Sequence, residues 1–270
     1  MNPFKVAALS TSVLCCPQIF ATPMIISDYE ADKRYVAFSM SPISQDLEVS
    51  DGTDSGNDSR DLMAVNLSFS NVQDSLGSVT PFYGIDLTSV SARYSPSEVI
   101  TRWSAGLLIP MENELNTVLK AGYITSSASH SLDTYSLALF TALEDSKNEN
   151  IIYELGLAGS QKESVSELEG GESLSLYAKS KFHIDKWSDV VVGVSTLHTQ
   201  TVEDTNGNNI DFDPSIALFV DSYFHPVRAF SLFIGASYQY GSESHNPVGE
   251  PSLTFKTTST VYRFGLQFEI

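Results

Sequence analysis

The sequence has little cysteine, little positive charge and no long hydrophobic run, and each lack excludes a class of protein. Its two cysteines are neighbours, Cys15 and Cys16, so the chain beyond them can form no disulfide. No segment after the first 21 residues approaches the roughly 18 consecutive apolar residues of a transmembrane helix. With 15 basic against 33 acidic residues the net charge is −18, and nucleic-acid phosphates would repel so acidic a chain. Nucleic acid is therefore excluded as an expected partner.

The first 21 residues have the layout of a secretory signal peptide. A single cation, Lys5, precedes an uncharged apolar run over residues 6–16. We predict cleavage between Ala21 and Thr22, which would remove both cysteines together with Lys5. Leu14 occupies a place where lipoprotein processing needs a small residue, so we expect no lipid anchor. Residues 1–21 are thus the predicted signal peptide, residues 22–33 a short periplasmic lead and residues 34–270 the folded domain.

Beyond residue 34, large apolar residues recur at every second position in short runs, which is the period of a β-strand. The last run ends on five of them: Tyr262, Phe264, Leu266, Phe268 and Ile270. About twelve such runs occur, each close to the roughly 9 to 11 residues that a tilted strand needs to cross the hydrocarbon layer. Only helices and closed barrels satisfy the backbone inside lipid. The pattern predicts an all-β fold, a transmembrane antiparallel up-and-down β-barrel of about 12 strands.

The connections between the runs support this architecture. Those after even-numbered runs are short, as at residues 185–188, and most of those after odd-numbered runs are longer, as at residues 42–60 and 241–258. Transmembrane barrels have short periplasmic turns and longer extracellular loops. Many acidic residues fall in the predicted loops, where we interpret them as solvated side chains, with divalent-cation bridging to lipopolysaccharide as the alternative. A change of apolar parity near Thr88 and Ser89 also predicts a β-bulge.

The end of the chain resembles the carboxy-terminal insertion signal of Gram-negative outer-membrane β-barrels. Arg263, Gly265, Phe268 and Ile270 fill its four defined places in order, although Ile270 stands where most such proteins have an aromatic residue. Strand number and length further resemble an autotransporter translocator barrel standing alone, without a passenger. The resemblance covers the whole mature chain and implies location in the cell outer membrane and insertion by the barrel-assembly machinery. It also implies contact with outer-membrane lipid and lipopolysaccharide, and a monomer.

The faces opposite the apolar ones carry charges of both signs that we expect to face the lumen. The candidates are Arg102, Lys120, Glu154, Lys179, Lys181 and Asp221. Such a set can line a narrow aqueous pore, or it can pair across the interior and block the pore. Pairing is favoured for at least some of them, because unpaired burial of a charge is costly.

Three functions remain open from the sequence. The first is a barrel with a structural or unassigned envelope role, and the alternative is a small porin or solute-specific channel. The third is a lipid or peptide hydrolase, but none of the five histidines has a local setting that resembles the known enzymatic barrels, and His225 before Pro226 is typical of a turn. We therefore expect no enzyme, no catalytic residues, no cofactor and no bound metal.

Overall fold

The computed structural model describes residues 30–92, 95–110, 116–127, 133–145, 148–163, 171–203, 207–247, 249 and 251–270. The predicted signal peptide and its Ala21–Thr22 bond lie outside these residues. The first seven strands are β1 (Lys33–Ser50), β2 (Ser55–Val72), β3 (Thr80–Ala92), β4 (Ser95–Pro110), β5 (Asn116–Ser126), β6 (Thr134–Asp145) and β7 (Asn148–Lys162). The others are β8 (Glu172–Asp185), β9 (Ser188–Thr199), β10 (Val202–Glu203), β11 (Asn209–Phe212), β12 (Ser215–Val227), β13 (Phe230–Asn246) and β14 (Leu253–Glu269).

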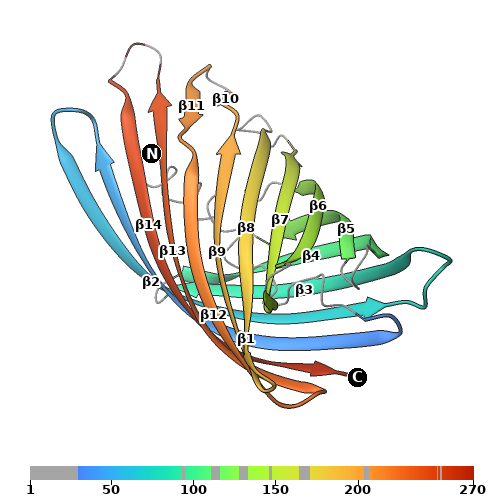
Figure 1. Cartoon of the computed structure of the whole chain (residues 1–270). Helices are drawn as coiled ribbons and strands as arrows, with labels where there is room; N and C mark the ends of the chain where they lie inside the picture. Colours follow the sequence, from blue (N-terminus) through green and yellow to red (C-terminus); the bar gives the residue numbers. More distant parts are fainter. Residues whose placement is uncertain are drawn as a thin grey trace.

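Twelve of these strands form a closed antiparallel barrel, as predicted. Each strand from β1 to β8 pairs with the next, β9 pairs with β12, β12 pairs with β13, and β14 closes the ring by pairing with both β13 and β1. The two short strands β10 and β11 form an extra hairpin, in which β11 continues the pairing of β13 beyond the start of β12. Figure 1 shows the tilted strands around the interior. No helix in the described ranges is long and apolar enough to cross a membrane.

The two chain ends of the barrel meet at one rim. Tyr35 on β1 lies opposite Glu269 on β14, and the backbone N–H of Ile270 donates to the carbonyl of Arg34 at 2.8 Å. We call this the terminal rim and the opposite one the distal rim. The paired residues can be followed from strand to strand once around the barrel, beginning at Lys33 on β1. The path returns to β1 at Leu47, which is a register stagger of fourteen residues. Closing a sheet requires such a stagger, because the strands must tilt relative to the barrel axis.

The barrel is apolar outside and largely small or polar inside. On β1, the exposed fractions of Phe38 and Met40 are 37% and 44%, whereas their neighbours Ala37, Ser39 and Ser41 are buried. The same alternation runs through the other strands and leaves a continuous set of leucines, isoleucines, valines and aromatic residues on the outer face. An exposed apolar band of this size is the surface that lipid covers in transmembrane barrels.

The interior also holds apolar clusters, and one of them corrects the predicted bulge. Val90 packs against Ile43, Ala64 and Val261 inside the barrel. The register of β3 with β2 is unbroken from Ala92 to Phe82, so no bulge lies at Thr88 and Ser89 against β2; the irregularity is between Val90 and Ala92 against β4. The parity of the apolar residues changes because Val90 faces inward, not because the strand is kinked.

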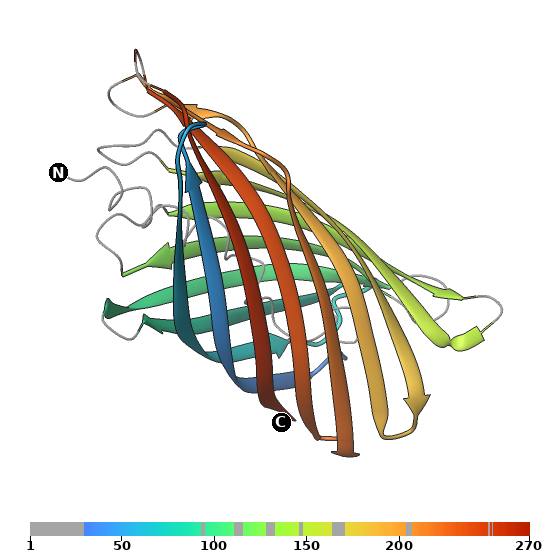
Figure 2. The same cartoon turned by 90° about the vertical axis from the view of Figure 1, so that its left-hand side faces the viewer.

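Two predicted loops are instead mostly strand. Residues 42–60 form the distal parts of β1 and β2 around a short turn at 51–54, and residues 241–246 and 253–258 form the distal parts of β13 and β14. Together we call residues 44–61, 241–246 and 253–258 the distal extension. Figure 2 shows these two hairpins rising at the end opposite the C-terminus. The expected acidic loop between β1 and β2 is therefore an acidic hairpin.

Candidate functional site

The interior of the barrel is the candidate site, and its shape depends on glycines that lie beneath aromatic rings. Gly106, Gly156, Gly193 and Gly265 face inward, and the positions that a Cβ atom would occupy are already filled by ring atoms of Phe82, Tyr177, Phe219 and Phe233 respectively. Each ring therefore lies flat over the neighbouring strand. Four large side chains follow the wall in this way and do not extend across the lumen.

A belt of seven charged residues lines the middle of the interior wall. Its members, which we call the belt, are Asp86, Arg102, Lys120, Glu154, Lys179, Asp221 and Arg263. Each of its three carboxylates lies close to a cation on another strand. Asp221 on β12 accepts two hydrogen bonds from Arg263 on β14, at 2.8 and 3.2 Å. Its carboxylate lies over Gly235 on the intervening strand β13.

The other two carboxylates of the belt lie beside cations on neighbouring strands. The Oε1 atom of Glu154 is 3.3 Å from the Nζ atom of Lys179, and the side chains are 2% and 19% exposed. Asp86 on β3 lies directly opposite Arg102 on β4. Burying a charge without a partner is costly, so this pairing makes a polar interior compatible with a stable wall.

Lys120 differs from the other cations of the belt. Its ladder neighbours are Gly106 on β4 and Ala138 on β6, and no ion pair or hydrogen bond joins it to another described residue. It interacts electrostatically with Asp86, Arg102 and Lys179. Since Lys179 also interacts with Asp221 on β12, the field of the belt extends from β5 through β8 to β12.

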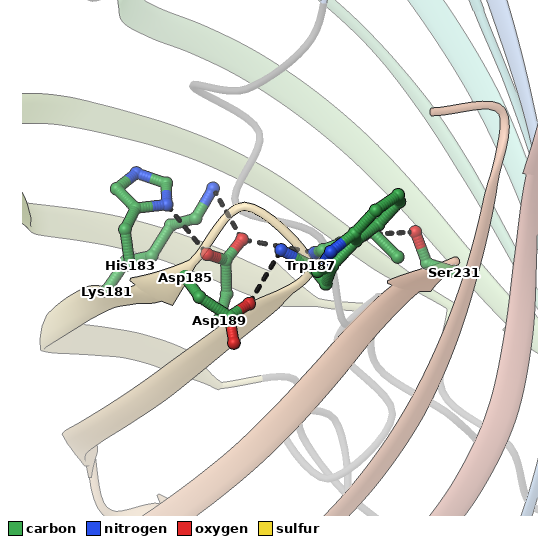
Figure 3. Close-up of polar contacts among 7 residues, drawn as sticks. Lys181, His183, Asp185, Trp187, Asp189 and Ser231 are labelled. Carbon is green, nitrogen blue, oxygen red and sulfur yellow. Dashed lines mark hydrogen bonds and ion pairs between the residues drawn. The ribbon is translucent and has the colours of Figure 1, made fainter. Parts of the chain in front are cut away.

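A second polar cluster lies near the terminal rim, on β8, β9, β12 and β13 (Figure 3). Asp189 is its centre: one carboxylate oxygen is 2.7 Å from His183 Nδ1, and the other is 3.4 Å from Lys181 Nζ and 3.2 Å from His225 Nε2. The Nδ1 atom of His225 lies 2.7 Å from the hydroxyl oxygen of Ser231. We call these five residues the mouth cluster. Ser231, His225 and Asp189 form a continuous chain of the residue types found in serine hydrolases.

The residues singled out from the sequence occupy two parts of the barrel. Five of the six lumen candidates are in the belt, and the sixth, Lys181, is in the mouth cluster. The four insertion-signal residues lie on both faces of the barrel wall. Arg263 and Gly265 on β14 face inward, whereas Phe268 on β14 and Ile270 just after it are exposed on the outer side. Within the described ranges, no group of His, Cys, Asp and Glu is arranged to hold a metal ion.

Sequence reasoning missed Asp86, the mouth cluster apart from Lys181, and the glycines under the rings. Asp86 could have been found, because it alternates with the outward Ile85 and Leu87. His225 was interpreted as part of a turn, whereas it lies within β12 and contacts Asp189 and Ser231. The partners in these contacts are 36 and 6 residues away from it in sequence, and only the strand register brings them together.

Comparison with known proteins agrees with this architecture. The structure is similar to an outer-membrane channel from Pseudomonas putida F1, with a TM-score of 0.62 and 11% identity over 90% of this chain and 99% of that chain. It is also similar to the translocator domain of the autotransporter NalP from Neisseria meningitidis, with a TM-score of 0.59 and 9% identity over 98% of each chain. The Pseudomonas putida toluene transporter TodX gives a TM-score of 0.50 and 8% identity over 92% of each chain.

These likenesses show a shared fold, since the identities are low. No protein-family model and no curated protein matches the sequence. The chain has the fold of outer-membrane β-barrels, a class that contains channels and autotransporter translocators. This fold, together with the exposed apolar band, places the protein in the cell outer membrane.

Proposed function

We propose that the protein is a narrow diffusion channel for small solutes, acting as a monomer in the outer membrane. The observation that carries this proposal is the placement of the four aromatic rings along the wall, over glycines, beside a belt in which Lys179 is 19% exposed. In this account the signal peptide directs export, and the terminal strand, with its insertion signal, is recognised by the barrel-assembly machinery. The outer face then contacts lipid and lipopolysaccharide directly.

Planar-bilayer conductance tests the channel, with two alanine substitutions on β7 as a matched pair. Gly156→Ala places a methyl group where the Tyr177 ring lies, so the ring must move toward the lumen and single-channel conductance should fall. Gly159→Ala is the control, because nothing lies within 4 Å of a Cβ atom there. A steady current that Gly156→Ala reduces and Gly159→Ala leaves unchanged is expected. A folded wild-type barrel without current would contradict the channel and favour a purely structural envelope role.

A hydrolase is the second candidate, and the chain Ser231–His225–Asp189 is the observation that favours it. His225 could accept the proton of the Ser231 hydroxyl while Asp189 orients the ring. Asp189 is also bonded to His183 and lies close to Lys181, which equally fits a structural network that ties four strands together at the mouth. A fluorophosphonate probe discriminates: labelling that Ser231→Ala abolishes would support the hydrolase, and an unlabelled folded barrel would exclude a reactive serine.

A further inference from the structure

The charge of the belt is opposite in sign to the charge of the chain. The belt has four cations and three carboxylates, so with every group ionised it carries one net positive charge, whereas the whole chain carries −18. Its three carboxylates each have a cation nearby, as described above. Lys120 is the fourth cation of the belt, and no carboxylate among the described residues forms an ion pair with it.

Lys120 faces the interior beside the Phe82 ring, which covers its ladder neighbour Gly106. Its two ladder neighbours, Gly106 and Ala138, are the smallest residue types, and the next inward residue on β5 is Gly122. The side chain is only partly buried. Lys179, from β8, interacts electrostatically with Lys120, so the two strands contribute positive charge to the same part of the interior.

We propose that Lys120, supported by Arg102 and Lys179, makes the belt an anion-selective site for small solutes that carry a carboxylate. This inference rests on the proposed channel and names its substrate class. A carboxylate near Lys120 supplies the acceptor oxygens that its ammonium group lacks in the wall, and a charge-assisted hydrogen bond of this kind is stronger than a neutral one. Low-dielectric walls around the lumen strengthen the attraction.

The acidic distal extension does not cancel this selectivity. Arg263 of the belt and Lys256, which lies beside Glu48 in the extension, are seven positions apart on β14, roughly 20 Å at about 3.3 Å per residue. The Debye length is about 8 Å at physiological ionic strength, so the exposed acids of the extension are largely screened from the belt. The charges of the belt, and not those of the extension, therefore decide which ions pass.

Reversal potentials in planar bilayers under a tenfold KCl gradient test the proposal. Wild type should pass chloride in preference to potassium. Lys120→Met keeps the apolar stem and removes the charge, and it should lower the chloride-to-potassium permeability ratio about two- to fivefold. Lys256→Met is the matched control, the same substitution at a lysine 45% exposed in the extension, and should leave the ratio unchanged. Potassium preference in wild type, or an unchanged ratio in Lys120→Met, would overturn the proposal.

Citrate binding to the detergent-solubilised barrel, measured by calorimetry, separates failure of the site from failure of the channel. If the belt is an anion site, citrate binds wild type and Lys256→Met and binds Lys120→Met at least several-fold more weakly. Binding of this pattern without current would contradict the channel and keep the anion site. Current without selectivity or citrate binding would keep the channel and refute the anion site.

Discussion

The belt and the distal extension contain the same kinds of charged residues in opposite settings. In the belt, Asp221 and Arg263 are buried and bonded at 2.8 Å across an intervening strand. In the extension, Glu48 and Lys256 approach to 3.7 Å with their side chains 47% and 45% exposed. The belt charges line the interior wall of the membrane-spanning part, whereas water solvates the extension. Burial therefore decides whether a charged side chain needs its partner. A charge in the buried belt does, and a charge in the exposed extension does not.

A double-mutant cycle on each pair gives the largest expected difference. Arg263→Ala should cost about 3 kcal/mol of unfolding free energy, because it leaves the Asp221 carboxylate buried without its partner. With Asp221→Ala as the second change, the coupling energy should be about 2 to 3 kcal/mol. The Glu48→Ala and Lys256→Ala cycle should give about 0 to 1 kcal/mol. Urea unfolding in lipid vesicles measures both, and equal coupling energies would break the comparison.

An arginine substitution on the outer face distinguishes the part of the barrel that faces lipid from the extension that faces water. Leu155→Arg puts a charge into lipid on β7 and should destabilise the barrel by about 2 to 4 kcal/mol. Asn57→Arg puts the same side chain on an exposed position of the extension and should change stability by no more than about 0.5 kcal/mol. If Leu155→Arg were as mild as Asn57→Arg, the outer face at that level would not be in lipid.

The smallest expected effect is local to the tip of the extension. Hydrogen bonds from the backbone N–H groups of Asp54 and Thr53, and from the Thr53 hydroxyl, lower the pKa of Asp51 from 3.8 to about 2. Because this pKa is depressed on folding, the carboxylate stabilises the turn fully above pH 3.8 and loses that effect as the pH falls through about 2. Thr53→Val removes the hydroxyl bond and should raise the midpoint measured by carboxyl carbon NMR. An unchanged midpoint would mean that the hydroxyl contributes nothing.

The strand number and the outward face could be predicted from sequence because period two is a local signal. Lipid requires apolar residues at every outward position, as in the run from Tyr262 to Phe268, so that requirement is visible in the sequence. The distal extension was predicted as loop because its outward residues, such as Asp46 and Glu48, face water and need not be apolar. There the apolar residues, Leu47 and Phe255, point inward and pack together.

The interior could be predicted only in part. The charged positions of the belt follow from the opposite parity to the apolar face. Their partners do not, because the contact of Asp221 with Arg263 joins residues 42 positions apart and depends on the register of three strands. The support of Tyr177 by Gly156 likewise requires knowing which residues of β7 and β8 are opposite each other.

Accessibility of two adjacent residues on β5 tests the central claim most directly, namely that side chains alternate between lipid and a water-filled lumen. In a background with Cys15→Ser and Cys16→Ser, Lys120→Cys and Leu119→Cys are each reconstituted in liposomes and exposed to a charged, water-soluble thiol reagent. The account predicts rapid modification at position 120 and protection at position 119, which faces lipid. Equal reactivity at the two positions, or modification of position 119 alone, would contradict it.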